Sequence, residues 1–447
     1  MKTIIKNATI INESQTFKGS LIINGDKIEK VIRADNELPT ENHIKIIDAE
    51  GLYLLPGVID DQVHFREPGL THKGDIYSES KAAVAGGITS YMEMPNTIPQ
   101  TTTLELLEQK YDLAASKSLA NYSFYMGATN DNIAEIIKVN KENVCGVKVF
   151  MGSSTGNMLV NDTETLKNIF AESPVLVATH CEDETIIQKN IRYFQHIFND
   201  CIKVDFHPLI RSAEACYQSS SFAVELAHRY NTRLHILHLS TEKELSLLDN
   251  TKPITEKNIT AEACVHHLWF TDEDYKIYGN RIKWNPAIKK PSDRDALIDA
   301  INKNLIDVVA TDHAPHSIEE KTADCYKASS GGPLVQHSLI AMLQLAKQRK
   351  FTIEKVVEKM CHTPADLFRI DKRGYIREGY YADLVLVNPN RPWIVEKGNI
   401  LYKCGWSPFE GITFDSIIEK TFVNGKLVFD NGAFDECFRG SRLTFIA

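Results

Sequence analysis

A cluster of polar side chains ends one apolar run, in the stretch GVIDDQVHFREPG at residues 57–69. Gln62, His64 and Arg66 stand at alternate positions, just before the turn at Pro68-Gly69. Strands normally end in turn residues rather than in such a cluster. Imidazole nitrogen is a preferred ligand of zinc-like metals, and the guanidinium fork of arginine matches a carboxylate. The stretch therefore indicates metal or anion chemistry.

Similar residues end other apolar runs in the centre of the chain. His180, His238 and Asp312 lie at the ends of three of them, in VLVATH, LHILHLS and DVVATD. Each histidine alone is more often a hydrogen-bonded core residue than a ligand. Together with His64 they would converge if the strands belong to one closed sheet. Imidazole and carboxylate groups then predict a bound divalent metal.

Lys148 lies between two valines in the run GVKVF. In an alternating strand it shares a face with Phe150, which could be the interior of a barrel. One alternative is an interior salt bridge. The other is a buried lysine with a lowered pKa, because burial favours the neutral amine. A neutral amine can add carbon dioxide, and the resulting carbamate could bridge two metals.

Other polar residues near these ends predict substrate contacts and acid–base chemistry. Asp312 could ligate a metal and also move a proton. Arg66 could hold a carboxylate, or could instead form a salt bridge to Glu67 or Glu93. His316 follows the last strand, in ATDHAPH, and could reach a substrate. Taken alone, Asn96 and Asn285 are only turn residues.

The order of the predicted elements indicates a barrel that would bring these ends together. Eight candidate strands alternate with amphipathic segments such as 103–118, 211–229 and 292–304. This pattern fits a (β/α)8 barrel better than an open sheet, and catalytic residues of such barrels lie at the carboxyl ends of the strands. The eight candidate strands are 57–65, 88–94, 122–128, 146–152, 175–180, 234–240, 259–265 and 307–312.

Both ends of the chain are rich in predicted strands. Alternating runs flank Asn24-Gly25, and the same arrangement recurs at Asn424-Gly425; both are hairpin signals. We therefore expect an α/β fold: a distorted (β/α)8 TIM-type barrel over 55–375, with a small composite β-sandwich domain built from 1–54 and 376–447. The loop at 324–338 should approach the active site.

Composition excludes some classes of function. The net charge of −9, without a basic cluster, argues against nucleic acid or an anionic membrane as a partner. The nine cysteines form no CxxC pair, and no apolar run approaches the ~20 residues that span a bilayer. The N-terminus shows no signal-peptide pattern. These features predict a cytoplasmic protein that acts on a small substrate.

Several motifs resemble those of the cyclic amidohydrolases. Within that family the resemblance is greatest to the dihydroorotases of the longer bacterial type. The resemblance spans nearly the whole chain, and REPG together with ATDHAPH is its most specific part. Allantoinases usually have a different residue in place of Arg66, and hydantoinases usually lack the arginine. The motifs are PGVIDDQVHFREPG, MEMPNT, GVKVFMGSSTG, THCEDE, LHLST, ATDHAPH and GYIREGYYADLVLVNP.

The resemblance implies a zinc enzyme with one or two ions per chain, acting on dihydroorotate and carbamoyl-aspartate in pyrimidine synthesis. It also makes a homodimer plausible. His64, His180, His238 and Asp312 match metal ligands, and Lys148 matches a lysine that is carbamylated in some members. Asp312 matches the catalytic acid/base. Four further positions match residues that bind substrate: Arg66, Asn96, Asn285 and His316.

One residue departs from the family pattern. The family has His-x-His in the first strand, whereas this chain has Gln62-Val63-His64. A glutamine oxygen is a weaker ligand than imidazole. Three alternatives follow: an active enzyme with one or two metals; an enzyme with one metal held by Lys148, His180 and His238; or a non-catalytic homologue that assembles with a pathway enzyme. A hydantoinase-type or allantoinase-type hydrolase is a further alternative.

Overall fold

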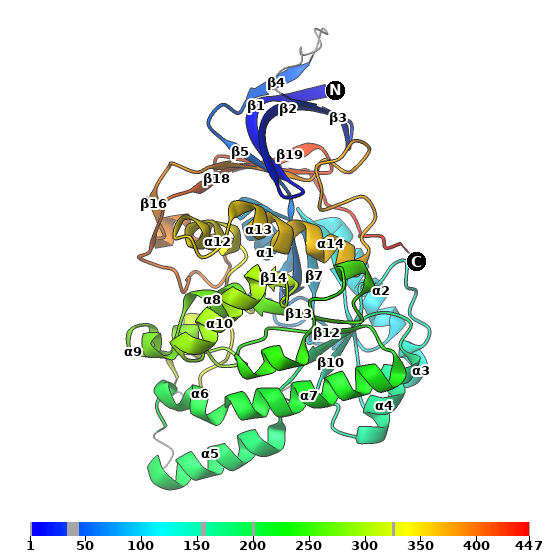
Figure 1. Cartoon of the computed structure of the whole chain (residues 1–447), viewed down its shortest axis with the longest axis vertical. Coiled ribbons are helices and arrows are strands. Elements are labelled where there is room, and N and C mark those ends of the chain that lie inside the picture. The colour runs from blue at the N-terminus through cyan, green and yellow to red at the C-terminus, as the bar shows by residue number, and fades with distance from the viewer. Residues whose placement is uncertain (1, 34–43, 153–157, 199–201, 324–326, 447) are drawn as a thin grey trace.

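The centre of the chain forms a closed barrel of parallel strands (Figure 1). The computed structural model describes residues 2–33, 44–152, 158–198, 202–323 and 327–446. All eight predicted strands are confirmed, and β8 and β9 form one barrel position that is interrupted only at Tyr125. The strands are β6 (Val58–Val63), β7 (Ile88–Glu93), β8 (Asn121–Phe124), β9 (Met126–Gly127), β10 (Val147–Phe150), β11 (Val177–His180), β12 (Leu234–Ile236), β13 (Ile259–Cys264) and β14 (Val308–Ala310).

Contacts between its first and last strands close the barrel. Val63 pairs in parallel with His313, and the backbone N–H of His64 donates to the carbonyl of His313 at 2.7 Å. Closure therefore joins GVIDDQVHF to ATDHAPH. In a parallel barrel the carboxyl ends of the strands face one side, so the predicted site residues of both motifs meet there.

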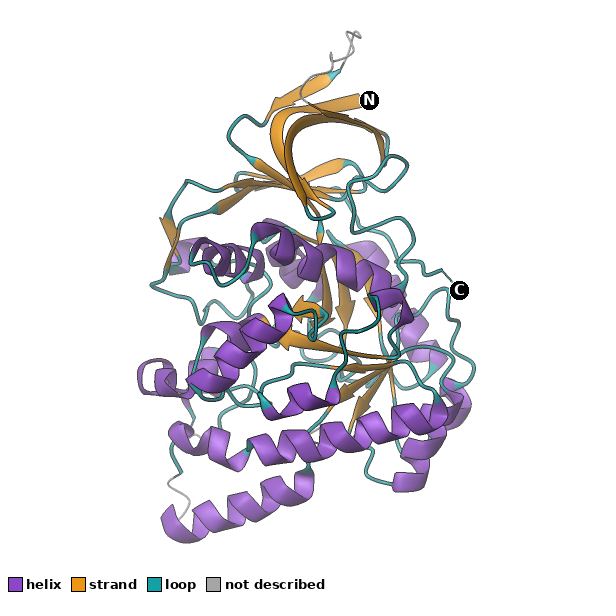
Figure 2. Ribbon diagram, viewed as in Figure 1, coloured by secondary structure: helices purple, strands orange, loops and turns teal. Residues whose placement is uncertain are grey.

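Helices surround the barrel strands (Figure 2). The three predicted helices are confirmed as α2 (Leu104–Lys117), α7 (Ala213–Tyr230) and α10 (Pro291–Asn302). The barrel is distorted because β12 is followed by a 3-10 helix at Lys243–Leu247 rather than an α-helix. The other helices are α1 (Ile76–Ala85), α3 (Ile133–Ile136), α4 (Thr163–Glu172), α5 (Glu184–Phe198), α6 (His207–Ile210), α8 (Val265–Trp269), α9 (Tyr275–Tyr278), α11 (Ile318–Thr322), α12 (Ser338–Lys347), α13 (Ile353–Val357) and α14 (Thr363–Phe368).

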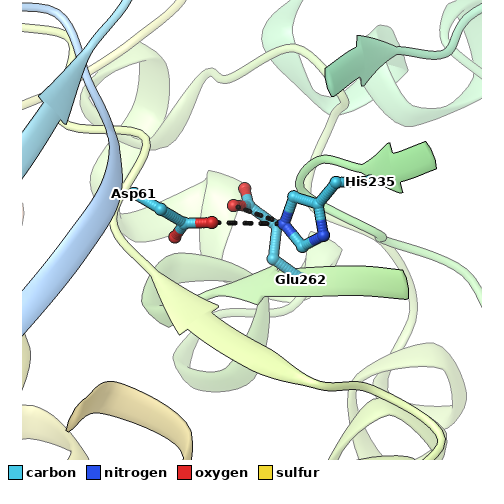
Figure 3. Close-up of side chains that lie close together, drawn as sticks. All are labelled: Asp61, His235 and Glu262. Carbon is cyan, nitrogen blue, oxygen red and sulfur yellow. Dashed lines mark ion pairs between the residues drawn. The ribbon is translucent and has the colours of Figure 1, made fainter. Parts of the chain in front are cut away.

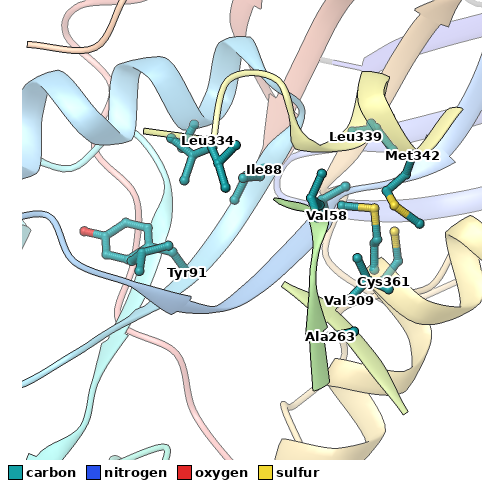
Figure 4. Close-up of a cluster of buried hydrophobic side chains, with 14 of the residues drawn as sticks. Val58, Ile88, Tyr91, Ala263, Val309, Leu334, Leu339, Met342 and Cys361 are labelled. Carbon is teal, nitrogen blue, oxygen red and sulfur yellow. The ribbon is translucent and has the colours of Figure 1, made fainter. Parts of the chain in front are cut away.

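The packing between strands and helices forms the main hydrophobic core. Figure 4 shows Val58 and Val309 from the barrel strands close to Leu339 and Met342 of α12. These four side chains are at most 1% exposed. Burying a side chain of this size stabilises the fold by about 1.5–3 kcal/mol. This packing holds the strands whose ends carry the site residues.

Both ends of the chain contribute to one curved nine-stranded sheet, which lies above the barrel in Figure 1. Gly25 and Gly425 adopt φ of 65° and 72° in the two predicted hairpin turns. The composite β-structure is confirmed, while the domain boundaries stay a prediction. Its strands are β1 (Lys2–Asn12), β2 (Gln15–Asn24), β3 (Lys27–Arg33), β4 (Lys45–Asp48), β5 (Tyr53–Pro56), β15 (Leu384–Asn388), β18 (Ile417–Val423), β19 (Lys426–Asp430) and β20 (Ala433–Phe434); β16 (Trp393–Ile394) and β17 (Thr413–Phe414) pair separately.

The described part of the chain has no helix that is long and apolar enough to cross a membrane. Its seven described cysteines are all unpaired, and five of them are buried.

Candidate active site

A cavity of about 710 Å³ opens among the carboxyl ends of the barrel strands. The glutamine that departs from the family pattern, Gln62, also lines it. The structure thus brings together every residue that the sequence predicted for the site, although their individual roles stay predictions. These residues are His64, Arg66, Asn96, Lys148, His180, His238, Asn285, Asp312 and His316.

His64 and Asp312 face each other across this cavity. The Nδ1–H of His64 donates to Oδ1 of Asn96 at 2.7 Å, while its Nε2 lies 3.1 Å from Oδ1 of Asp312. Burial lowers the pKa of His64, which favours the neutral ring. In that ring the Nε2 lone pair points at a carboxylate oxygen. Two acceptors at this distance require a proton or a cation between them.

His180 and His238 form a second pair of facing polar side chains. Nδ1 of His180 lies 2.9 Å from Nε2 of His238, and Nε2 of His180 donates to Glu182 at 3.0 Å. Burial lowers the pKa of both histidines, and the charge of Lys148 contributes. The pair is therefore neutral. One of the two facing nitrogens carries the hydrogen of this contact, and a bound metal would take its place.

Glu182 fixes the orientation of His180. It is fully buried and forms an ion pair with Arg211. Burial by itself would raise its pKa, but the charge of Arg211 and the hydrogen bond from His180 lower the pKa to about 2. A carboxylate that accepts from one ring nitrogen fixes the tautomer of a metal-binding histidine.

Lys148 projects from β10 into the cavity with its Nζ 4.7 Å from the centroid of the Phe150 ring. The two side chains thus share a face, as the alternation predicted. No carboxylate of a described residue forms an ion pair with Lys148, so the interior salt bridge is not found. Burial lowers the pKa of Lys148 to about 8. The neutral form of this amine is therefore far more populated near pH 7 than in an exposed lysine.

Arg66 is a buried cation at the wall of the cavity. Its Nε donates to the carbonyl of Pro315 at 3.0 Å, and its terminal nitrogen donates to Nε2 of His316 at 3.1 Å. The alternative salt bridges are not formed, because Glu67 pairs with Lys117 and Glu93 pairs with Lys110. Arg66 makes no ion pair with a carboxylate of any described residue.

His316 is oriented for this contact by the loop after β14. Its Nδ1–H donates to Glu320 at 3.2 Å, which leaves the Nε2 lone pair for Arg66. Burial lowers the pKa of His316 far below its usual value, and the charges of Arg66 and Lys73 lower it further. His316 is therefore a neutral acceptor.

Three of the predicted residues have backbone conformations that non-glycine residues rarely adopt. Arg66, His238 and Asp312 have φ of 71°, 42° and 46°. Such conformations cost about 1–3 kcal/mol each and concentrate at functional sites. The surrounding fold holds these side chains in the cavity against that cost.

The sequence did not single out every residue of the site. The roles of Glu182 and Arg211 were missed, although the THCEDE motif places a carboxylate two residues after His180. Ser329, Ser330 and Gly331 line the cavity, so the described part of the 324–338 loop does approach it. Residues 324–326 of that prediction lie outside the described residues.

The donor set suits a metal. Two neutral imidazoles face each other, a third imidazole faces a carboxylate, and a lysine with a lowered pKa lies in the same cavity. A model of the amidohydrolase family matches residues 53–428, which include all of these side chains.

The chain belongs to the amidohydrolase family. Among its curated relatives are dihydroorotases of two methanogens. The protein of Methanosarcina acetivorans is 32% identical over 95% of this chain and 91% of its own length. That of Methanosphaera stadtmanae is 31% identical over 88% of this chain and 89% of its own length.

Solved structures of hydantoinases and dihydropyrimidinases share the fold. The L-hydantoinase (dihydropyrimidinase) of Arthrobacter aurescens superposes with a TM-score of 0.89, at 25% identity, over 97% of both chains. The dihydropyrimidinase of Brevibacillus agri superposes with a TM-score of 0.88, at 23% identity, over 100% of both chains. The predicted barrel with an added β-structure is therefore confirmed as the fold of amidohydrolases.

Proposed function

We propose that the protein is a zinc-dependent dihydroorotase, which interconverts dihydroorotate and N-carbamoyl-aspartate. The observation that carries this proposal is the buried guanidinium of Arg66, which lines the cavity and forms no ion pair with a described carboxylate. The relatives named dihydroorotase, each more than 30% identical over most of the chain, support it.

Arg66 selects the substrate class. It is only 7% exposed, and burial lowers its pKa to about 10, so it remains charged. A buried charge without a partner is unfavourable, and a substrate carboxylate in this cavity would compensate it. Dihydroorotate carries such a carboxylate, whereas hydantoin and dihydrouracil do not. Asn96, Asn285 and His316 line the same cavity and would complete the substrate contacts.

The facing nitrogens of His180 and His238, and of His64 beside Asp312, fit a resident zinc. His180 and His238 would hold one ion together with the carbamate formed on Lys148. His64 and Asp312 would hold a second ion, with Gln62 in the place of the usual histidine ligand beside them. When bound, zinc lowers the pKa of water from 15.7 to about 7 and polarises a carbonyl oxygen.

Asp312 is the proposed acid/base of the reaction. Its Oδ1 accepts from Nε2 of Gln62 at 3.2 Å and lies 3.1 Å from Nε2 of His64. It takes the proton of the attacking water and delivers it to the ring nitrogen that leaves. Arg66 holds the substrate carboxylate while this proton moves, which fixes the amide carbon beside Asp312.

A hydantoinase-type activity is the second candidate, because the solved structure that is 25% identical is an L-hydantoinase. A comparison of substrates decides between the two. We would load the protein with zinc in bicarbonate and measure kcat/KM on dihydroorotate, hydantoin, dihydrouracil and allantoin. We expect dihydroorotate to be preferred by at least about 100-fold, since the buried cation penalises an uncharged ring. Equal or better turnover of an uncharged ring would contradict the proposal.

A further inference from the structure

A second group of ionisable side chains lies inside the barrel, outside the cavity. Asp61 on β6, His235 on β12 and Glu262 on β13 point toward one another (Figure 3). All three are 0% exposed, and none is among the residues that line the cavity. The proposed catalytic residues do not include them, so the proposed function leaves this cluster unexplained.

The cluster contains buried polar atoms without hydrogen bonds. Both carboxylate oxygens of Asp61, Oε2 of Glu262 and Nε2 of His235 have no hydrogen-bond partner among the described residues. Buried polar atoms in proteins are nearly always satisfied, because an unsatisfied one costs about 1–3 kcal/mol. Ion pairs from Nε2 of His235 to Asp61 and Glu262 compensate these atoms in part (Figure 3). Both carboxylates share that one nitrogen, so a ligand of higher charge between them would satisfy the cluster better.

The hydrogen bonds around His235 orient its Nε2 toward the two carboxylates. Thr260 Oγ1 donates its only proton to the carbonyl of Leu234 at 3.1 Å. It can therefore only accept from Nδ1–H of His235, at 2.8 Å. Burial alone would lower the pKa of His235, but its contacts with Asp61 and Glu262 raise the pKa to about 9. Without a metal, Nε2 therefore carries a proton that faces the two carboxylates, and a metal would take the place of that proton. A hydrogen bond of this kind to the distal ring nitrogen is typical of metal-binding histidines.

The distances between the donor atoms fit a metal. Nε2 of His235 lies 3.2 Å from Oδ2 of Asp61 and 3.6 Å from Oε2 of Glu262. One ligand atom from each residue lies within 4.8 Å of the other two. Two ligands at 2.0–2.1 Å from a tetrahedral ion are about 3.3 Å apart. The observed separations lie on either side of that value.

The charge of the cluster also favours a divalent ion. Two ionised carboxylates with one imidazolium would carry one net negative charge. Burial, together with the charge of Asp61, raises the pKa of Glu262, so the metal-free cluster favours a second proton there. A divalent cation with a neutral imidazole brings the charge to zero. One imidazole and two carboxylates suit zinc or manganese, whereas magnesium and calcium favour oxygen ligands alone.

We propose that Asp61, His235 and Glu262 bind a structural divalent transition-metal ion in the barrel interior, in addition to any ion in the cavity. The ion lies beneath the floor of the active site, because Oε1 of Glu262 accepts from the backbone N–H of His238 at 2.9 Å. It joins β6, β12 and β13 below the cavity. This site does not depend on the proposed reaction.

The test separates this site from the cavity by mutation. A double variant, His180→Asn with His238→Asn, removes two cavity ligands and keeps the backbone contact to Glu262. We would refold it with zinc alone, pass it through a desalting column and measure zinc by mass spectrometry. We expect it to keep about one ion per chain, and to lose that ion when Asp61→Asn is added.

Asp60→Asn is the matched control in the same background. Asp60 is a buried carboxylate of the same strand that accepts from the N–H of Thr311 at 3.2 Å, outside the cluster. It should leave the zinc content unchanged. A double variant without zinc, or equal losses with Asp61→Asn and Asp60→Asn, would overturn the proposal.

A second measurement uses the unmodified chain and so does not depend on the folding of the variants. Crystals of the unmodified chain grown with zinc would be measured on both sides of the zinc absorption edge. An anomalous peak between Asp61, His235 and Glu262 supports the site. The absence of a peak there would overturn the proposal, whatever the cavity contains. Protons, on His235 and between the carboxylates, would then hold the cluster together.

Discussion

Nε2 of Gln62 donates a hydrogen bond to Oδ1 of Asp312 at 3.2 Å, across the closure of the barrel. Gln62 stands where the family pattern has a histidine. Its amide therefore contacts the proposed acid/base directly, and its Oε1 lies 3.9 Å from Sγ of Cys264. We predict that this contact orients Asp312.

Replacing Gln62 with methionine should lower kcat on dihydroorotate. Methionine keeps a similar volume but cannot donate to Asp312. A hydrogen bond to a charged group contributes about 1.5–3 kcal/mol, so the fall should be roughly 10- to 100-fold, with KM little changed. Steady-state kinetics of Gln62→Met measures it. Unchanged kcat would mean that the amide does not orient Asp312.

The variant Gln62→His tests the metal count. It restores the family pattern beside His64, and we expect it to bind about one zinc more per chain than the unmodified protein, because imidazole is the stronger ligand. Mass spectrometry of zinc in both proteins measures it. Equal zinc content would show that Gln62 does not weaken the site.

Arg66→Gln should nearly abolish turnover of dihydroorotate. The loss of one partner of a buried charge pair costs about 3–5 kcal/mol, which corresponds to a fall in kcat/KM of roughly 10²–10³-fold or more. Lys81→Gln is the matched control, because Lys81 pairs with Glu436 at 2.6 Å and is not among the residues that line the cavity. If Arg66→Gln stays within a few-fold of the unmodified enzyme, the substrate is not held by its carboxylate.

Glu182→Gln should weaken metal binding although it replaces none of the proposed ligands. The carboxylate orients His180 and pairs with Arg211, and loss of such a partner typically costs 10–100-fold in metal affinity. Competition for zinc against a chromogenic chelator measures the affinity directly. Glu225→Gln is the control, because Glu225 forms an exposed pair with Arg229. Equal affinity in both variants would argue against an orienting role.

Carbamate formation on Lys148 should depend on pH. Burial lowers the pKa of Lys148 from 10.5 to about 8, so the reactive neutral amine increases as pH rises through about 8 and is scarce at pH 6. The ¹³C signal of the carbamate, measured on metal-free protein at fixed dissolved carbon dioxide, should follow this rise. Lys148→Met should lack the signal. A signal that appears only near pH 10.5 would contradict the lowered pKa.

Most of the barrel could be predicted from the sequence because each strand is a short apolar run with a polar end. The run DVVATD illustrates this, since β14 (Val308–Ala310) is buried and Asp312 follows it. The 3-10 helix after β12 was not predicted. The segment 184–210, whose role the sequence left open, contains α5 and α6. There His207 bonds to the carbonyl of Trp284 at 2.8 Å, a long-range contact without a local signal.

The predicted site residues were found because they follow strands that converge. The residues that support them could not be predicted in this way. Arg211 lies 29 residues from Glu182 and meets it only through the fold. The cluster of Asp61, His235 and Glu262 was not predicted because its members lie on three different strands. In addition, Asp61 is only one of several polar residues in the first motif.

The most direct test of the account is the hydrolysis of dihydroorotate by zinc-loaded protein beside Asp312→Asn, with zinc content measured in both. We predict turnover by the unmodified protein and a loss of about 10²–10⁴-fold in Asp312→Asn, as expected for removal of an acid/base. Zinc-loaded, folded protein without turnover of dihydroorotate would contradict the account and favour a non-catalytic homologue.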